Sequence, residues 1–206
     1  LFNRMPKLKL ILQTGGHAYH IDTRAAQQRN IVIALGRKVK APLISVPELT
    51  FAFMLGLIHK VHQGPYAMQN GEWKLFTGRT LSGRRLGILG LGRHGSRVAH
   101  VASTAFNMEV VAWNRSENKY EERYAVKRLP LDELLATSDV VSIHLRLSPE
   151  SVGLINKERL AKMKPDALLI NTSRGAIVDE NALIEALTKR TIEGAGLDVF
   201  AEEPLP

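Results

Sequence analysis

Two groups of residues in this chain have the types and the spacing that redox chemistry needs. The first is a glycine pattern, G-x-G-x-x-G, formed by Gly90, Gly92 and Gly95 directly after an apolar run. The second is an arginine, Arg174, and an acid, Glu203, each after a stretch typical of a buried strand. Backbone amides of such a glycine turn bind the pyrophosphate of a dinucleotide. The sequence therefore predicts a dinucleotide cofactor, with charged groups beside it that can act on a substrate.

The glycine pattern has the neighbours that a dinucleotide site requires. A strand is predicted before it at 86–89, a helix after it at 95–106, and a second strand at 109–113. In such a unit the first glycine makes the tight turn, the second lets the backbone approach the phosphates, and the third lets helix and strand pack closely. Arg93 and His94 lie inside the turn and are predicted to contact the cofactor with the three glycines. A purely structural turn is the alternative, and the flanking elements disfavour it.

The position expected to meet the adenosine ribose indicates which form of the cofactor binds. An Asp or Glu about 20 residues beyond the glycine pattern would accept a hydrogen bond from the ribose 2′-hydroxyl and would repel a 2′-phosphate. Here the position holds Asn114, followed by Arg115 and Ser116, which together can accept that phosphate. The sequence therefore favours NADP over NAD. The alternative is that Asn114 still binds the ribose of NAD while Arg115 faces water.

Composition and charge narrow the class of protein. The chain has 206 residues, of which 45% are hydrophobic and 23% charged, as in a folded globular protein. It has no cysteine, which excludes disulfides, thiolate catalysis and sulfur-ligated metals, and we expect no metal site. The formal charge of +8 arises almost wholly in residues 1–47, which hold eight basic residues and one acid. Since aromatic residues are not interleaved with these charges, we expect a solvated face, or the face of a domain of which half is missing, rather than a nucleic-acid site.

Hydropathy gives no sign of a membrane segment. The longest apolar run, 49–58, is half the ~20 residues that a bilayer span needs. No stretch resembles a signal peptide. We therefore expect a cytoplasmic protein without a membrane partner.

Short apolar runs alternate with amphipathic ones along the chain, as in a parallel sheet covered by helices. Runs such as 167–170 are apolar on both faces, as a buried parallel strand requires. The predicted fold class is α/β, with a doubly wound parallel sheet of the Rossmann type. Strands are predicted at 9–13, 31–34, 86–89, 109–113, 140–144, 167–171 and 194–199, and helices at 23–29, 46–63, 95–106, 131–137, 157–163 and 180–188. The polar stretch 69–83 is predicted to be a linker.

The order of motifs along the chain resembles the D-isomer-specific 2-hydroxyacid dehydrogenase family, which includes phosphoglycerate dehydrogenase and glyoxylate/hydroxypyruvate reductase. Besides the glycine pattern, the resemblance is carried by residues 6–9, 14–16, 21–22, 47–50, 71–73, 81–87, 144–147, 163–165, 171–179 and 196–204. So many motifs in order are specific for the family, and they say little about which substrate is used.

The resemblance implies a role for each charged residue. Arg174 matches the family's arginine, whose planar fork can bind a substrate carboxylate through two parallel bonds. Glu203 matches the acid that pairs with a catalytic histidine and raises its pKa, so that the histidine can donate a proton to a keto acid. Asp198 matches the aspartate that contacts the nicotinamide carboxamide. The structural alternatives are an arginine at a sheet edge, a surface glutamate and a helix cap.

Other site residues follow from the same resemblance. The loop with Gly15, Gly16 and His17 is expected to offer backbone amides to the substrate carboxylate. The cofactor is expected to contact residues at or just after the ends of two strands, namely His144, Leu145, Arg146, Thr172 and Ser173. Arg146 departs from the family pattern, in which proline is common at that position. It either reaches the adenosine phosphate or faces solvent.

The resemblance also implies that the chain is part of a longer enzyme. The family's histidine lies in a motif beyond the Glu-Pro step, and none of the seven histidines here replaces it convincingly. Residues 1–44 correspond to part of a flavodoxin-like substrate domain, and 45–206 to the dinucleotide domain with a linking helix at 46–63. That broadly apolar helix is expected either in the core or in a two-fold dimer interface. We expect the full-length protein to be a homodimer.

The expected activity is hydride transfer between NAD(P)(H) and a small 2-hydroxy or 2-keto acid. A nucleotide-sensing binding protein without catalysis, like the corepressors in the family, is the main alternative. A bare dinucleotide-binding module with unrelated chemistry is a third, which the presence of both Arg174 and Glu203 disfavours. We expect the 206-residue piece alone to bind nucleotide weakly and not to turn over.

Overall fold

The structure, a computed structural model, forms two compact units, Leu1–Ile44 and Ser45–Pro206. It describes residues 2–13, 18, 21–36, 41–74, 76–116 and 119–205. Gly15, Gly16 and His17, which were predicted to bind substrate, lie outside the described residues. Each unit has a hydrophobic core of its own.

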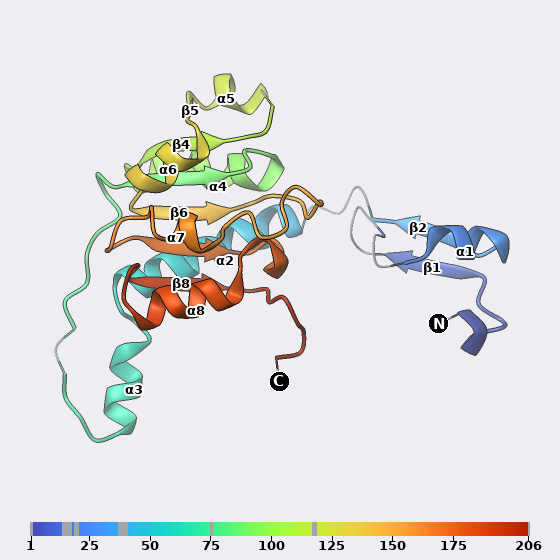
Figure 1. Cartoon of the computed structure of the whole chain (residues 1–206), viewed down its shortest axis with the longest axis horizontal. Coiled ribbons are helices and arrows are strands. Elements are labelled where there is room, and N and C mark those ends of the chain that lie inside the picture. The colour runs from blue at the N-terminus through green and yellow to red at the C-terminus, as the bar shows by residue number, and fades with distance from the viewer. Residues whose placement is uncertain are drawn as a thin grey trace. The chain divides into compact units, whose positions relative to one another are not determined.

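The larger unit is built on a six-stranded parallel sheet (Figure 1). Its strands in chain order are β3 (Arg85–Leu89), β4 (Glu109–Trp113), β5 (Lys127–Arg128), β6 (Val140–Ile143), β7 (Leu168–Asn171) and β8 (Gly194–Leu197). In space they run β5-β4-β3-β6-β7-β8, and every neighbouring pair is parallel. The strand order reverses between β3 and β6, which is where a doubly wound sheet has its ligand crevice. The predicted fold class is confirmed.

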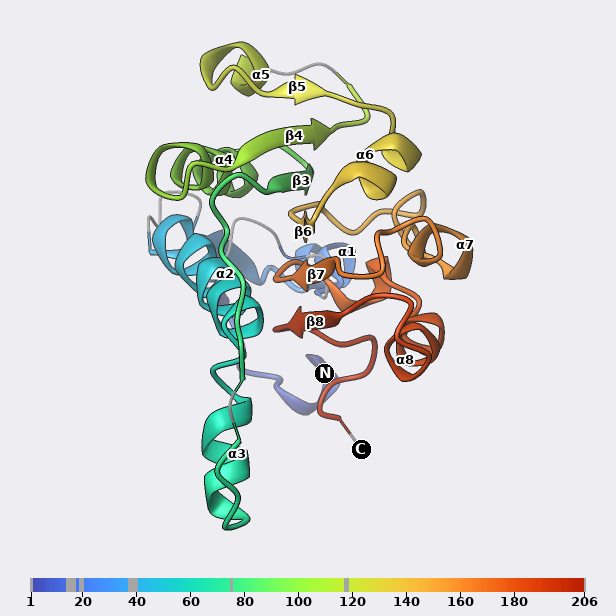
Figure 2. The ribbon, with the colours of Figure 1, turned by 90° about the vertical axis from the view of Figure 1, so that its left-hand side faces the viewer.

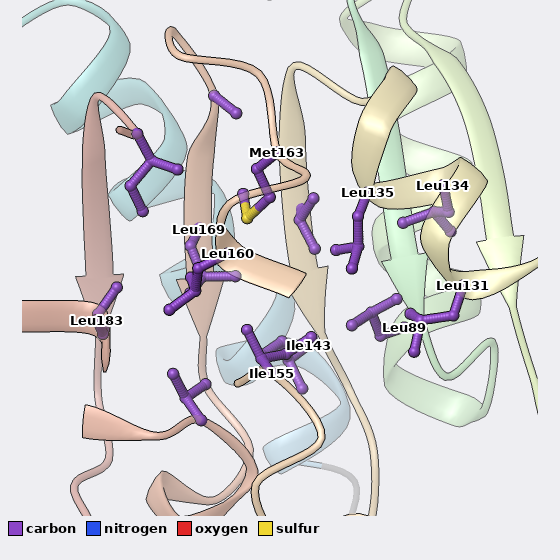
Figure 3. Packing of buried hydrophobic residues seen from close by; sticks show 14 of the residues in the cluster. Leu89, Leu131, Leu134, Leu135, Ile143, Ile155, Leu160, Met163, Leu169 and Leu183 are labelled. Atoms are coloured by element: carbon purple, nitrogen blue, oxygen red, sulfur yellow. The ribbon is translucent and has the colours of Figure 1, made fainter. Parts of the chain in front are cut away.

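Helices cover both faces of this sheet (Figure 2). The helices of the larger unit are α2 (Pro42–Ile58), α3 (Gln63–Gln69), α4 (Arg93–Ala105), α5 (Lys119–Arg123), α6 (Leu131–Thr137), α7 (Lys157–Leu160) and α8 (Glu180–Thr188), with a 3-10 turn η2 (Gly175–Ile177), and of these α3 leads away from the sheet. On one face, α6, α7 and α8 pack through Leu134, Leu160 and Leu183 (Figure 3). On the other face, α2 and α4 pack through Met54 and Val98. The strands β6 and β7 are buried throughout, which explains their nearly unbroken apolar sequence.

Most elements of the larger unit lie within three residues of their predicted bounds. The bounds of β4, α6 and α8 are those predicted. The short elements β5, α3 and α5 were not predicted, because two to seven residues carry too little periodicity to be recognised. The predicted linker at 69–83 falls within the larger unit, ahead of the glycine turn.

The predicted helix at 46–63 is wrong at both ends. α2 starts earlier, at Pro42, where proline fits because the first position of a helix needs no N–H donor. It also ends earlier, in a left-handed cap: Lys60 has a φ of 57°, and the Val61 N–H donates to the Gly56 carbonyl at 2.9 Å. Glycine usually occupies the left-handed position of such a cap. Because a lysine stands there, no residue type marks the end of the helix.

The smaller unit is a parallel strand pair with a helix between the strands in sequence. Its elements are η1 (Phe2–Arg4), β1 (Leu10–Gln13), α1 (Thr23–Gln28) and β2 (Val32–Leu35). α1 starts at a capping residue, Asp22, whose carboxylate accepts from the Ala25 N–H at 2.9 Å. The core of this unit is small and is centred on Phe2, Ala26 and Ile31.

No single helix in the described part of the chain is long and apolar enough to cross a membrane. Only α2 and α3 taken together reach that length and composition, and they are bent by 59° relative to each other.

Candidate cofactor and substrate site

The carboxyl ends of five neighbouring strands meet at one edge of the sheet. In the register of the sheet, Leu89 is paired with Trp113 and with Ile143. Ile143 is paired in turn with Asn171, and Asn171 with Leu197. The residues directly after these strand ends are Gly90, Asn114, His144, Thr172 and Asp198. The structure therefore brings to one edge five residues that the sequence predicted to contact the cofactor.

The turn after β3 is shaped by three glycines with different surroundings. Gly90 has a φ of 98°, and a Cβ there would lie 2.8 Å from the carbonyl oxygen of His144. A Cβ on Gly95 would lie 2.2 Å from the Gly90 oxygen, so α4 packs on the turn without room for a side chain. A Cβ on Gly92, which caps α4, would meet nothing within 4 Å. This open space at a helix N-terminus fits the approach of a pyrophosphate.

Asn114, at the end of β4, is held by the chain itself. Its Oδ1 accepts from the Leu91 N–H at 2.7 Å, and its Nδ2 donates to Glu121 Oε1 at 3.0 Å. The side-chain amide therefore ties the glycine turn to α5, a task that the sequence did not indicate. Glu121 places a carboxylate beside the expected ribose position, although no acid follows β4 directly.

The two residues after Asn114 are accessible to a ligand. Arg115 and Ser116 are both exposed. Arg115 Nη1 lies 3.6 Å from Glu150 Oε2, and the two side chains are 78% and 66% exposed. An ion pair in such surroundings contributes little stability. The Arg115 guanidinium can therefore leave Glu150 for a phosphate at small cost.

His144 lies beside the glycine turn, directly after β6. Its Nε2 is 2.9 Å from the Ser142 hydroxyl. Removal of the ring from water, and to a smaller extent the nearby His94, lower the pKa of His144 to about 3. The imidazole is therefore neutral near neutral pH. The next residues diverge, because Leu145 packs against the core whereas Arg146 is exposed.

The loop after β7 is folded around the buried side chain of Asn171. Asn171 Oδ1 accepts from the N–H and the hydroxyl of Ser173, at 3.0 and 2.9 Å. Asn171 Nδ2 donates to the carbonyl of Arg174 at 3.0 Å. The Arg174 side chain is exposed, and its Nη1 donates to the Ser173 carbonyl at 2.6 Å. Asn171 thus fixes the backbone that carries Arg174 and leaves the guanidinium at the surface.

Thr172 and Asp198 reach the sheet edge in different ways. The Thr172 side chain is buried, and its hydroxyl lies 3.2 Å from that of Thr50 in α2. Only the backbone of Thr172 is therefore suited to contact a cofactor. Asp198 is exposed, and its N–H donates to the Asn171 carbonyl at 3.1 Å, which continues the pairing of β7 with β8 by one residue.

The loops with the predicted catalytic pair touch at Gly175. A Cβ on Gly175 would lie 2.0 Å from the carbonyl carbon of Phe200. The Phe200 N–H donates to Glu203 Oε1 at 2.9 Å. The segment with Arg174 and the segment with Glu203 are therefore direct neighbours, and both side chains are exposed.

Residues 51–206 match the model of the NAD-binding domain of the D-isomer-specific 2-hydroxyacid dehydrogenases. The chain belongs to this family. The matched segment contains the whole six-stranded sheet and the glycine turn, so most of the larger unit corresponds to the NAD-binding domain of this family.

Curated relatives of this chain include glyoxylate and hydroxypyruvate reductases. It is 37% identical to a glyoxylate reductase of Thermococcus litoralis over 214 residues, which cover 99% of this chain and 64% of the relative. It is 45% identical to glyoxylate/hydroxypyruvate reductase B of Pectobacterium carotovorum subsp. carotovorum over 168 residues, which cover 79% of this chain and 52% of the relative. The chain therefore spans about half to two thirds of the length of these relatives.

Solved structures give the same assignment. The TT0316 protein of Thermus thermophilus superposes with a TM-score of 0.87 at 38% identity, over 100% of this chain and 65% of that one. A D-lactate dehydrogenase of Aquifex aeolicus, complexed with NAD and lactic acid, superposes with a TM-score of 0.82 at 33% identity, over 98% and 61%.

Three residues that shape the site were missed by sequence reasoning. Asn171 and Gly175 lie inside the motif at 171–179, and this position could have indicated that they belong to the site. Glu121 had no signal, because it approaches Asn114 from a separate helix.

Proposed function

We propose that the full-length protein transfers hydride between a nicotinamide cofactor and a small 2-keto or 2-hydroxy acid. The observation that carries this proposal is the common sheet edge, where the glycine turn and the loops of Arg174 and Glu203 all follow strand ends. In doubly wound folds this edge binds ligands. When bound, the nicotinamide supplies or accepts the hydride. The names of the two reductases above support substrates of this size.

Arg174 binds the substrate carboxylate in this proposal. The Asn171 side chain fixes the backbone of Arg174 through a hydrogen bond to its carbonyl. The hydrogen bond from Arg174 Nη1 to the Ser173 carbonyl leaves further N–H donors of the guanidinium for a ligand. Two parallel bonds from a guanidinium to a carboxylate fix the orientation of the neighbouring carbon, which a lysine would not do. A keto group next to that carboxylate would therefore be held in one orientation.

Glu203 is the acid that pairs with the family's catalytic histidine in this proposal. Its Oε1 accepts from the Phe200 N–H, which leaves Oε2 to accept from an imidazole. A carboxylate in that position stabilises the imidazolium, which then donates its proton to the keto oxygen. His144 does not suit this role, because its pKa of about 3 leaves it without a proton to donate at neutral pH.

The preferred cofactor form in this proposal is NADP, with NAD as the alternative. Arg115 and Ser116 are exposed at the end of β4, where this fold class binds the adenosine ribose. A weakly held guanidinium and a hydroxyl can both donate to a 2′-phosphate. Glu121 opposes this binding, because its carboxylate lies 3.0 Å from the Asn114 amide nitrogen at the same strand end. The preference therefore rests on Arg115 and Ser116 outweighing Glu121.

The smaller unit is part of the substrate domain in this proposal. Gly15, Gly16 and His17 stay predicted to bind the substrate carboxylate, the two glycines through their backbone N–H groups. The cytoplasmic location, and the absence of nucleic-acid and membrane partners, stay predictions from the sequence.

The full-length protein is a homodimer in this proposal, and the arm formed by residues 59–74 is its contact surface. α3 leads away from the sheet in both views of the ribbon (Figures 1 and 2). The most exposed apolar side chains of the arm are Tyr66 (71%), Met68 (63%) and Trp73 (82%). Large apolar groups gathered on one exposed segment mark an interaction site. A second copy is the proposed occupant, because a two-fold interface pairs one apolar patch with itself.

The proposed activity is tested by following NADPH and NADH oxidation by the full-length protein. The acids to compare are glyoxylate, hydroxypyruvate, pyruvate and a bulkier keto acid. We expect oxidation with at least one small acid and a higher kcat/KM with NADPH than with NADH. Binding of NADPH without reduction of any acid would replace this proposal by a nucleotide-sensing role.

A further inference from the structure

Glu180 makes a contact that its place in α8 does not require. It is the first residue of the helix, after the cap Asp179, whose carboxylate accepts from the Ala182 N–H at 3.0 Å. An acid in this turn is favourable for the helix dipole wherever its side chain points. The Glu180 carboxylate nevertheless leaves the helix, and its Oε1 accepts from the backbone N–H of Ala201 at 2.5 Å. The bond joins residues that are 21 positions apart.

Glu180 thus holds the peptide between Phe200 and Ala201, and this peptide packs on Gly175. A Cβ on Gly175 would lie 2.0 Å from the carbonyl carbon of Phe200 and 2.4 Å from the nitrogen of Ala201. The peptide is therefore fixed from two sides, by van der Waals contact with Gly175 and by a charged acceptor on Glu180. A hydrogen bond from a backbone N–H to a carboxylate is about twice as strong as one to a neutral acceptor.

The adjoining peptide, between residues 199 and 200, binds Glu203. The Phe200 N–H donates to Glu203 Oε1 at 2.9 Å, so the Glu203 carboxylate is bound one residue away from the peptide nitrogen that Glu180 holds. On the other side, Gly175 directly follows Arg174. A continuous set of contacts thus runs from Glu180 through Ala201 and Phe200 to Glu203, beside the backbone of Arg174.

We propose that Glu180 is a positioning residue, whose carboxylate holds the 200–201 peptide on Gly175 and so sets the place of Glu203 relative to Arg174. This inference rests on the proposed function, in which Arg174 binds the carboxylate and Glu203 orients the histidine. Glu180 itself touches neither substrate nor cofactor. It acts as a hydrogen-bond acceptor, so an amide at this position preserves its action and a methyl group abolishes it.

The test compares three variants of the full-length protein in keto-acid reduction. Glu180→Ala removes the acceptor, whereas Glu180→Gln keeps a carbonyl acceptor and removes the charge. Glu185→Ala is the matched control, because Glu185 also lies on α8 but binds Lys157 and Lys189, at 2.9 and 2.5 Å, away from the 200–203 loop. The measurements are kcat, KM, the Kd of NADPH and the pH profile of kcat.

We expect Glu180→Ala to lower kcat by about tenfold to a hundredfold, the cost of misplacing a catalytic group by a fraction of an ångström to one ångström. The Kd of NADPH should change little. The descending limb of the pH profile should move to lower pH, because a histidine less well held by Glu203 has a lower pKa. Glu180→Gln should restore kcat to within about threefold of the wild type. Glu185→Ala should leave kcat and the pH profile unchanged.

Two kinetic results would overturn the inference. One is a Glu180→Ala variant with wild-type kcat and pH profile. The other is a Glu180→Gln variant impaired as strongly as Glu180→Ala, which would assign the effect to helix charge instead of the bond to Ala201.

Amide hydrogen exchange gives an answer independent of turnover and of how well the alanine variant folds. The Ala201 amide of the wild type should be protected by about tenfold or more relative to a free loop amide, and Glu180→Gln should retain that protection. An unprotected Ala201 amide in the wild type would refute the anchor even if the enzyme is active. A protected amide in a protein that reduces no keto acid would uphold the anchor while the proposed function fails.

Discussion

The side-chain amide of Asn171 donates to the backbone carbonyl of Arg174 at 3.0 Å, while its oxygen accepts from the N–H and the hydroxyl of Ser173. One buried amide thus makes three hydrogen bonds within the loop that carries the substrate-binding arginine of the proposed function. Each hydrogen bond satisfies a backbone or side-chain polar group that would otherwise need a water molecule as its partner. The loop backbone is therefore fixed while the Arg174 guanidinium stays exposed.

Replacing Asn171 by Ala should destabilise the fold and impair substrate binding together. The change leaves the Ser173 N–H and hydroxyl without their acceptor in a buried place, so we expect a loss of about 2 kcal/mol in the free energy of unfolding. KM for the keto acid should rise by more than the Kd of NADPH. Urea unfolding and steady-state kinetics measure the two effects. Asn70→Ala, which removes an exposed bond to the Tyr66 carbonyl, should change stability by less than about 1 kcal/mol.

Gly175→Ala should be among the most damaging small substitutions in the chain. A methyl group there meets the Phe200 carbonyl carbon at 2.0 Å, and backbone cannot move aside as a flexible side chain does. We expect a loss of about 2 kcal/mol or more in the free energy of unfolding, as for an overpacked core, together with loss of kcat. Wild-type stability and turnover in this variant would show that the 200–201 peptide can lie elsewhere.

Gly92→Ala should weaken cofactor binding and leave the stability of the fold nearly unchanged. A methyl group at Gly92 meets no atom within 4 Å, so the free energy of unfolding should change by less than about 0.5 kcal/mol. The methyl group would occupy the space through which the phosphates approach the backbone, and we expect the Kd of NADPH to rise about tenfold or more. Calorimetric titration of the wild type and of Gly92→Ala with NADPH measures this difference in Kd. Equal affinities would place the pyrophosphate away from this turn.

The neutral state of His144 should make stability depend on pH. Its pKa is about 3 in the folded chain and near 6.5 when unfolded. Between these values the unfolded chain binds a proton that the folded chain does not. The stabilising contribution is therefore complete above the unfolded pKa and is lost as the pH falls toward 3. In urea unfolding between about pH 4 and pH 7, the wild type should lose more stability than His144→Gln as the pH falls. Parallel curves would contradict this account.

The arm should control association. Trp73→Ser removes the most exposed large apolar side chain on it, and we expect a higher fraction of monomer for the full-length protein in sedimentation velocity. Ile184→Ser is the matched control, since Ile184 is 62% exposed on α8, outside the arm. Its association state should equal that of the wild type. A wild type that is monomeric at all concentrations would refute the dimer.

The sheet and its flanking helices could be predicted from the sequence because the hydrophobic periodicity and the length of each segment indicate the same type of element. β4 and α8 illustrate this, since each has a clear apolar pattern and α8 also has a capping residue, Asp179. The end of α2 could not be predicted, because Lys60 takes a backbone conformation that its residue type rarely adopts.

The candidate site was predicted as a set of positions but not as a set of contacts. Gly90 and Arg174 were predicted as site residues because each occupies a motif position whose backbone or side chain is expected to contact a ligand. The bonds of Asn114 to Glu121 and of Glu180 to Ala201 were not, since each joins separate elements and depends on how these elements pack. The roles of Arg174 and Glu203 stay predictions, and Gly15, Gly16 and His17 lie outside the described residues.

The reversal of strand order between β3 and β6 divides the sheet into two halves that contribute different parts of the site. The glycine turn and Arg115 belong to the half with β3, β4 and β5, whereas Arg174 and Glu203 follow strands of the half with β6, β7 and β8. A dinucleotide that extends across the reversal touches both halves at once. Since a ligand that binds only the folded state raises the free energy of unfolding, cofactor occupancy should suppress partial opening of either half, and protease resistance should rise in both with the same dependence on cofactor concentration.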